Sequence, residues 1–285
     1  MMKRTALLIL LVVSVFAEIN ASNDHLPTKE DYKAFLKSKT LVVMDTNPMS
    51  DFNFKIKEVM KDVWNLTDYE FITQKEFEEK VGDPSYSFLL STTVTFSMDK
   101  TKARYTFLSL LMGKPETEVR DLPDLCSIPL SYLRVEDDSY AYKMEVFVRF
   151  IQDHVKLMNA QPELIKANVF KYYNKNIESL KNKTLYLVKD DLSPDVNSMS
   201  KLQKYYPYDV KIVTQEDIEE VLKKRDPNVV ILHKVGPEGT KYKARCYKIL
   251  VGAADSRFYY FDYHMVSSKR PDGLLNSDLK QMGSR

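Results

Sequence analysis

Two arginines end similar tripeptides in distant parts of the chain. Arg104 closes one Lys-Ala-Arg motif, and Arg245 closes a second. A planar guanidinium group can bind a carboxylate through two parallel hydrogen bonds. Both arginines are therefore candidate ligand-binding residues. The alternative is that each one ties a hairpin to an acid or carbonyl group of its own module.

Acidic residues follow two apolar segments that are typical of β-strands, residues 40–44 and 184–188. Asp45 follows the first segment, and Asp190 and Asp191 follow the second. Ligands of open α/β sheets bind at the carboxyl ends of the strands. Asp45 and Asp190 are therefore candidate ligand-binding residues, with a helix-capping or loop role as the alternative.

Other catalytic and metal-binding patterns are weak. His233 and His264 could face one another near Asp262, but this spacing matches no known zinc signature. A Ser-x-x-Lys pattern occurs three times, and only Ser198 is placed to open a helix. The chain has 7 glycines and no Gly-rich phosphate-binding loop. We therefore expect no catalytic residue, no metal site and no cofactor.

An aromatic strand is expected at residues 257–266. Side chains of a strand alternate between two faces. One face would place Tyr259, Phe261 and Tyr263 outward or toward another part of the molecule. Because aromatic residues are enriched at interfaces, these three are candidate partner-binding residues. Packing in the core or between modules is the alternative.

The two cysteines, Cys126 and Cys246, leave two possibilities open. In an oxidising compartment they could form a disulfide that joins two parts of the chain. They could equally be separate buried thiols, which behave as small apolar side chains.

The chain contains an internal repeat. Residues 36–43 read LKSKTLVV and residues 180–187 read LKNKTLYL. Further along, both copies continue with a strand, a Thr-Gln pair at a helix start, an Asp-Pro pair and the Lys-Ala-Arg motif. Thr73 and Thr214 each precede an acidic residue by three positions, which predicts a capping box. Four matches in the same order indicate a duplication.

The repeat predicts an α/β fold of two tandem β-α-β-α-β-β-β-α modules, at residues 22–160 and 161–285. Each module should form a mixed sheet with helices packed on it. The expected strands lie near residues 40–44, 69–72, 86–93, 103–111 and 130–135, and near 184–188, 209–213, 228–233, 242–251 and 257–266. Helices are expected at 52–65, 74–81 and 140–159, and at 196–206, 215–224 and 274–282, with an insertion at 121–128 in the first copy.

The N-terminus predicts export. Lys3 and Arg4 precede an apolar run at residues 6–16, about half the roughly 20 residues needed to span a membrane. Residues 1–21 are therefore expected to be a signal peptide. The chain has 42 Lys and Arg against 40 Asp and Glu, and removal of residues 1–17 deletes Lys3 and Arg4 and no acidic residue, which leaves no net charge. We expect no nucleic-acid surface and no membrane span after cleavage.

The element order resembles the N-terminal α/β domain of periplasmic Tol-type translocation proteins and related curli-secretion lipoproteins. The segments that carry the resemblance are LVVMD, YEFITQKEF, SYSFLLSTTVTF and ARYTFLSLLMG, with their counterparts in the second copy. The chain departs from that pattern because its module is doubled and no β-propeller follows. The resemblance implies contacts with other proteins of the cell envelope.

These observations together favour an exported, non-catalytic protein of the cell envelope or periplasm that binds another envelope or secreted protein. The alternative is a protein that binds a small ligand or a glycan in the cleft between its modules, because ligand sites favour such junctions.

Overall fold

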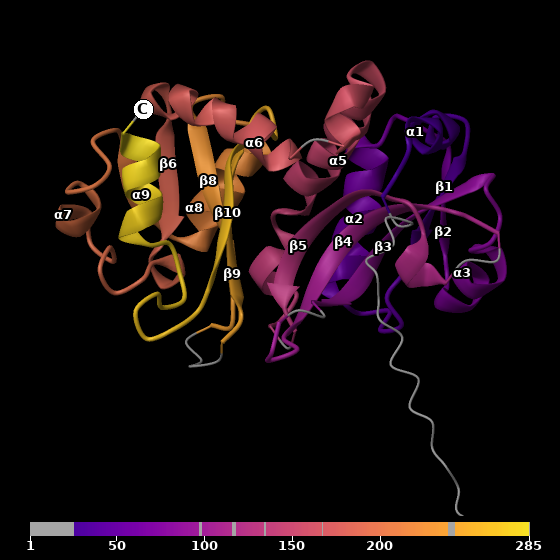
Figure 1. Ribbon diagram of the computed structural model, residues 1–285, viewed down its shortest axis with the longest axis horizontal. Helices are drawn as coiled ribbons and strands as arrows, with labels where there is room; N and C mark the ends of the chain where they lie inside the picture. Colours follow the sequence, from indigo (N-terminus) through magenta and orange to yellow (C-terminus); the bar gives the residue numbers. More distant parts are fainter. Residues whose placement is uncertain are drawn as a thin grey trace, which may run out of the picture.

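The computed structural model describes residues 26–96, 99–115, 118–133, 135–166, 168–238 and 243–284. Two five-stranded mixed sheets lie side by side, with helices on their faces and between them (Figure 1). This arrangement confirms the predicted α/β class. The predicted signal peptide, residues 1–21, lies outside the described residues.

The first sheet has the strand order β2-β1-β3-β4-β5. β1 pairs in parallel with β2 and β3, and the remaining strands form an antiparallel meander. Its strands are β1 (Lys39–Val43), β2 (Tyr69–Ile72), β3 (Tyr86–Thr95), β4 (Arg104–Met112) and β5 (Asp124–Tyr132). The helices of this module are α1 (Lys29–Phe35), α2 (Asp51–Val63), α3 (Gln74–Lys80), η2 (Val119–Asp121), α4 (Asp138–Ala141) and α5 (Met144–Ala160).

The second sheet repeats the topology, with the order β7-β6-β8-β9-β10. Its strands are β6 (Thr184–Val188), β7 (Val210–Val213), β8 (Val229–Val235), β9 (Arg245–Gly252) and β10 (Phe258–Met265). The helices that accompany it are η3 (Pro162–Lys166), α6 (Val169–Tyr173), η4 (Asn174–Asn182), η5 (Lys189–Asp191), α7 (Met199–Leu202), α8 (Gln215–Lys224) and α9 (Asn276–Gly283). The shared strand order is what a duplicated module requires.

The helices that follow β2 and β7, which are α3 and α8, begin as their sequences predict. The Thr73 hydroxyl accepts a hydrogen bond from the Glu76 N–H, and the Glu76 carboxylate accepts one from the Thr73 N–H. Thr214 and Asp217 repeat this arrangement at the start of α8. Both capping boxes are therefore confirmed.

Three expected elements differ from the structure. The segment expected as an insertion, residues 121–128, lies largely in β5, which starts at Asp124. The helix expected at 196–206 is reduced to α7, because Ser198 has an extended backbone and the helix begins only at Met199. The closing helix of the first module is split into α4 and α5.

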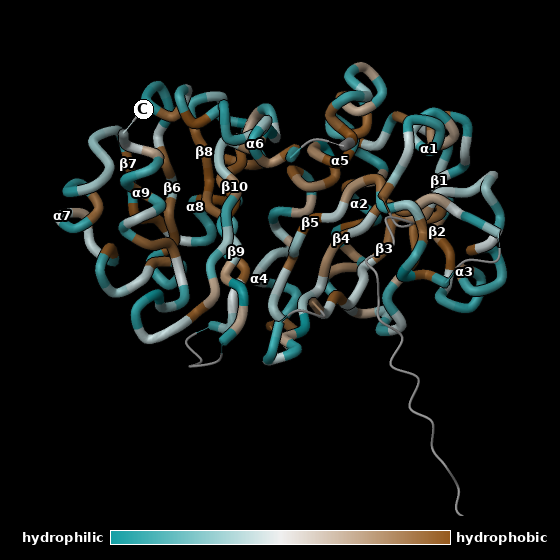
Figure 2. Tube along the Cα trace, viewed as in Figure 1, coloured by the Kyte–Doolittle hydropathy of each residue, from teal (hydrophilic) through white to brown (hydrophobic). Residues whose placement is uncertain are grey.

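One apolar core runs through both modules. α5 packs on α2 and the first sheet, and its other side meets the second sheet. Phe150 of α5 stacks on Phe258 of β10 with ring centroids 3.6 Å apart. Figure 2 shows the apolar strands of both sheets, with more hydrophilic segments toward the periphery. α5 therefore belongs to the first module by sequence and to both by packing.

The free edge of β10 is partly covered by side chains that imitate a neighbouring strand. The Asn174 amide accepts a hydrogen bond from the Phe261 N–H and donates one to the Phe261 carbonyl. The Asn176 amide donates to the Phe258 carbonyl. Satisfying an edge in this way limits pairing with other chains.

Among the described residues, no helix combines the length and the apolar character that a membrane crossing requires.

Candidate ligand-binding site between the two modules

Arg245 joins the two modules instead of lining a pocket. Its guanidinium group makes two hydrogen bonds with the Asp99 carboxylate, at 2.7 and 2.9 Å. Asp99 lies in the connection between β3 and β4, so this ion pair crosses the junction. The guanidinium also lies 3.7 Å from the centroid of the Phe96 ring. The predicted bidentate geometry is present, but the carboxylate belongs to the chain itself.

Arg104 and Arg245 do not occupy equivalent positions, which corrects the sequence alignment. Arg104 alternates with Leu108 and Leu110, on the face of the first sheet that α2 and α5 cover. Arg245 alternates with Ile249, on the opposite face, where α8 covers the second sheet as α3 covers the first. The two motifs are therefore shifted by one residue, and in a strand such a shift reverses the face.

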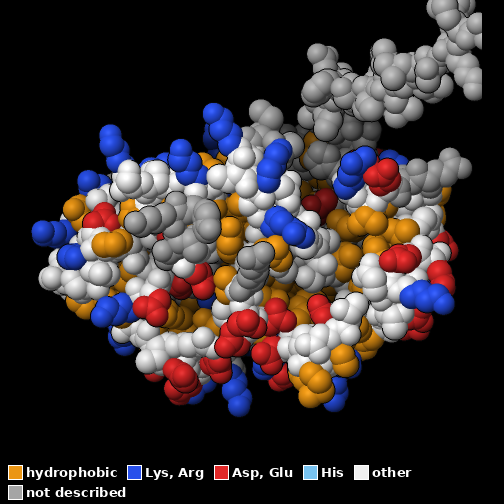
Figure 3. Space-filling model, turned by 90° about the horizontal axis from the view of Figure 1, so that it is seen from below, with side chains coloured by type: hydrophobic (Ala, Val, Ile, Leu, Met, Phe, Trp, Pro, Cys, Tyr) orange, Lys and Arg blue, Asp and Glu red, His pale blue; other side chains and the backbone are white. Residues whose placement is uncertain are grey.

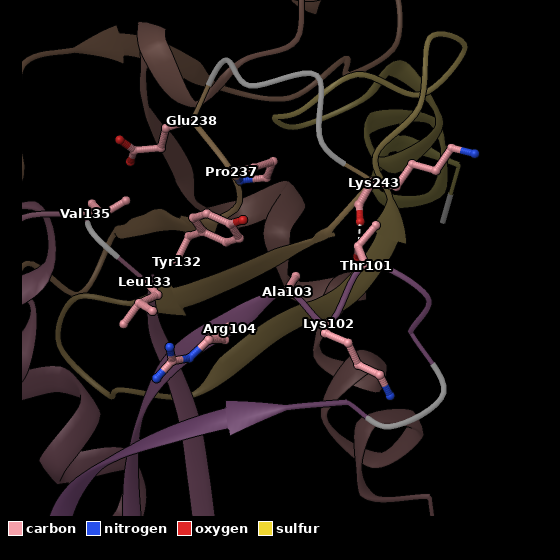
Figure 4. A pocket seen from close by; sticks show the side chains of 10 residues that line it. All are labelled: Thr101, Lys102, Ala103, Arg104, Tyr132, Leu133, Val135, Pro237, Glu238 and Lys243. Carbon is pink, nitrogen blue, oxygen red and sulfur yellow. Dashed lines mark hydrogen bonds between the residues drawn. The ribbon is translucent and has the colours of Figure 1, made fainter.

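Arg104 borders an open groove of about 520 Å³ near the tips of the hairpins. Figure 4 shows Arg104, Lys102 and Lys243 pointing in different directions around this groove, while Thr101 donates a hydrogen bond to the Lys243 carbonyl. Diverging cations do not surround a common point. Seen from below, the molecule carries both charge signs, with acidic side chains gathered toward one margin (Figure 3). The groove is therefore a weak candidate for a specific anion site.

The two candidate aspartates are exposed. The Asp45 carboxylate accepts a hydrogen bond from the Asn47 N–H and so shapes the loop after β1. Asp190 lies in η5 and borders a polar surface hollow. Its neighbour Asp191 is the less exposed of the pair and lies closer to other charges.

The three aromatic candidates lie in three different environments. Tyr259 is buried in the second module, and its hydroxyl donates to the Asp255 carboxylate. Phe261 stacks on Phe170 at the module junction, with ring centroids 4.2 Å apart. Tyr263 is 43% exposed. A register shift near Tyr259 separates it from the face that holds the other two.

Both cysteines are free and buried, so the disulfide that the sequence left open does not form. His233 and His264 bind backbone carbonyls, of Pro129 and Pro271. Within the described ranges, no three His, Cys, Asp or Glu side chains are grouped closely enough to hold a metal ion.

A pocket of about 280 Å³ lies at the junction of the modules. It is bounded by the segment before α1, by β5 and α5 of the first module, and by η3, α6 and β10. Its walls are mainly apolar and aromatic side chains from both modules, including Ile128, Phe150, Met158, Phe170, Phe258 and Phe261. Ligand pockets typically combine such walls with a few convergent polar groups.

The convergent polar groups are Tyr32, His154 and Tyr173. The Tyr32 hydroxyl donates to the Leu125 carbonyl at 2.8 Å. His154 Nε2 lies 3.5 Å from the Tyr32 hydroxyl, and His154 Nδ1 lies 2.7 Å from the Tyr173 hydroxyl. Burial lowers the pKa of His154 to about 4, so the imidazole is neutral at pH 7.

These contacts determine which polar hydrogens of Tyr32, His154 and Tyr173 remain available to a ligand. A neutral imidazole has one donor and one acceptor nitrogen. Because the Tyr32 hydrogen goes to Leu125, His154 Nε2 donates toward Tyr32 and Nδ1 accepts from Tyr173. All three polar hydrogens are then used inside the protein. The lone pairs of the two tyrosine oxygens remain, and they favour a ligand that donates a hydrogen bond.

Asp124 lines the pocket, and the described lining residues include no lysine or arginine. The Asp124 carboxylate accepts a hydrogen bond from the Ser127 hydroxyl at 2.7 Å. An anionic ligand would therefore lose its hydration among mainly apolar walls without a lysine or arginine among the described lining residues to pair with it.

From the sequence, Phe261 was a candidate for partner binding, whereas Tyr32, His154 and Tyr173 were not candidates for any site. The one available signal was His154, a polar residue within the apolar stripe of α5 that also contains Phe150, Ile151 and Met158. Its partners come from α1 and α6, and helical periodicity does not show which helices meet.

Comparison with models of protein families, with curated proteins and with solved structures finds no match for this chain. The resemblance to Tol-type domains stays a prediction that rests on element order.

Proposed function

We propose that the protein binds a small, largely apolar molecule in the pocket between its two modules. The observation that carries this proposal is the mainly apolar pocket of about 280 Å³ around Tyr32, His154 and Tyr173. The ligand is not an anion and carries a hydrogen-bond donor, because the mainly apolar walls disfavour an unpaired negative charge and the tyrosine lone pairs accept hydrogen bonds. Export under the predicted signal peptide places the activity in the periplasm or outside the cell.

A matched ligand series tests the proposal. Three naphthalene derivatives differ only in one substituent: aminomethyl, hydroxymethyl or carboxylate. We expect the amine and the alcohol to bind in isothermal titration calorimetry and the carboxylate to bind at least tenfold more weakly. Asp124→Asn should reduce the advantage of the amine over the carboxylate. Equal binding of all three, or no binding of any, would refute the proposal.

We also propose that the protein binds another envelope protein. Of the three aromatic residues expected at this surface, only Tyr263 is exposed. Tyr263 and Met265 are 43% and 38% exposed on the part of β10 that lies beyond Phe261 and its Asn174 cap. A partner that contacts this strand would be lost after Tyr263→Ala and retained after Phe54→Ala, which changes a distant exposed aromatic side chain of α2. Cross-linking in the host envelope followed by mass spectrometry distinguishes the two variants.

A further inference from the structure

A second and smaller cavity lies at the carboxyl ends of β6 and β8, beside the start of α8. Its volume is about 120 Å³, which is room for roughly four water molecules at about 30 Å³ each. Both modules contribute to its walls. The polar side chains around it include Ser131, Ser139, Lys143, Asp191, Gln215 and Lys234.

Lys143 is the unusual member of this group. It is 3% exposed and precedes the first turn of α5. Its ammonium group lies 4.8 Å from the centroid of the Tyr142 ring. Among the described residues, no carboxylate lies within 4.0 Å of Lys143 Nζ. Lys234, in contrast, has two carboxylate partners at ion-pairing distance.

The surroundings favour the uncharged amine of Lys143. Burial removes the ammonium group from water, and the charge of Lys234 opposes a second positive charge nearby. Together with the partly opposing effect of Asp191, they lower the pKa of Lys143 to about 8. At pH 8 about half of the Lys143 side chains would then be neutral amines.

Two charged neighbours, Lys234 and Asp191, complete the site. Lys234 Nζ lies 3.1 Å from Asp272 Oδ2 and 3.9 Å from Asp191 Oδ1. Burial opposes the charge of Lys234, but these two carboxylates outweigh it and raise the pKa of Lys234, so its side chain stays an ammonium group. Burial raises the pKa of Asp191, so its carboxylate accepts a proton more readily than that of an exposed aspartate.

We propose that Lys143 is a carbonyl-reactive lysine that forms an imine with a small aldehyde or ketone held in this cavity. A desolvated lysine beside a second cation is the arrangement that activates an amine as a nucleophile. The site is separate from the aromatic pocket and does not depend on the function proposed for it.

The step balances without any oxidant or reductant. The lone pair of Lys143 Nζ forms a bond to the carbonyl carbon, and the carbonyl electron pair moves to its oxygen. The Asp191 carboxylate takes one proton from the nitrogen and passes it to this oxygen, which gives a neutral carbinolamine. The nitrogen lone pair then expels the hydroxyl group, to which Asp191 transfers the second nitrogen proton, so one imine and one water molecule form for each carbonyl compound bound.

Reductive trapping tests this proposal on the full mature chain. The protein is incubated at pH 7 with glycolaldehyde, a two-carbon aldehyde, and sodium cyanoborohydride, and the labelled lysines are located by peptide mass spectrometry. We expect Lys143 to be labelled at least tenfold faster than Lys75, whose side chain is 85% exposed. The labelling rate of Lys143 should reach half its maximum near pH 8, whereas that of Lys75 should still rise above pH 9.

Two variants separate this mechanism from simple accessibility. Asp191→Asn should slow the labelling of Lys143 several-fold, while Lys189→Met, a change at an exposed neighbour in η5, should leave it unchanged. The midpoint of urea unfolding of each variant shows whether the fold is retained. Labelling of Lys143 no faster than that of Lys75, or with the same pH dependence, would overturn the proposal.

Discussion

The guanidinium group of Arg245 illustrates how much the surroundings of a residue decide its role. Arg104 and Arg245 end the same tripeptide, yet one is exposed beside an open groove and the other is bound to Asp99 across the module junction. The sequence could not separate them, because a shift of one residue in a strand changes the face without changing the local motif. The capping threonines were predictable because their partners lie only three residues away.

The Arg245 ion pair should contribute measurably to stability. Arg245→Ala leaves the largely buried Asp99 carboxylate unpaired, and we expect it to lower the free energy of unfolding by about 2 to 3 kcal/mol. Arg104→Ala is the matched control and should change it by less than about 0.5 kcal/mol. Urea unfolding followed by circular dichroism measures both. Equal effects of the two variants would show that the junction does not depend on this pair.

His154 should make stability depend on pH. Its folded pKa of about 4 lies below the ordinary value of 6.5, so the unfolded chain binds a proton that the folded protein does not. The contribution of His154 to stability is therefore complete above the unfolded pKa and is lost as the pH falls from 6.5 toward 4. Between pH 7 and pH 4.5 the wild type should lose about 2 kcal/mol more than His154→Gln. Parallel losses in both proteins, measured by urea unfolding, would contradict the assignment.

The elements of the fold were predictable where their signals are local. Both sheets were predictable from apolar strand segments, capping boxes and the repeated order of elements. The predicted lengths of α7 and β5 were wrong. α7 begins only after Ser198, whose backbone is extended, and residues 124–128 become strand because β4 offers them a partner. The pocket was not predictable, because the helices that form it meet only through tertiary packing.

The two capping boxes should stabilise their helices to similar extents. Thr73→Ala and Thr214→Ala each remove an acceptor for a free backbone N–H group at the start of α3 or α8. Each change should lower the free energy of unfolding by about 1 kcal/mol. Thermal and urea unfolding of both single variants provide the comparison. A negligible effect at both positions would mean that the helix starts are fixed by packing alone.

At the scale of the whole molecule, the shared core makes the two modules interdependent. α5 packs against both sheets, and Arg149 of α5 donates hydrogen bonds to the carbonyls of Ala253 and Ala254 in the second module. The pocket exists only because the modules are joined in this way. Residues of both copies of the repeat line the pocket, so the sequence of one copy alone does not predict it.

This interdependence predicts cooperative unfolding. Residues 26–284 should unfold in a single calorimetric transition, with equal calorimetric and van't Hoff enthalpies. Phe150→Ala removes a side chain stacked between the modules and should lower the free energy of unfolding by about 3 to 5 kcal/mol while the transition stays single. Two separate transitions in the wild-type protein would show that each module is stable by itself.

The most direct test of the proposed binding function compares ligand affinity in two matched variants. Phe170 and Phe54 are 45% and 54% exposed, and only Phe170 lines the junction pocket. Isothermal titration calorimetry with the naphthalene amine should show that Phe170→Ala weakens binding about tenfold, or about 1.4 kcal/mol, while Phe54→Ala leaves it unchanged. If both variants bind as the wild type does, or if both lose affinity equally, the ligand does not occupy the pocket between the modules.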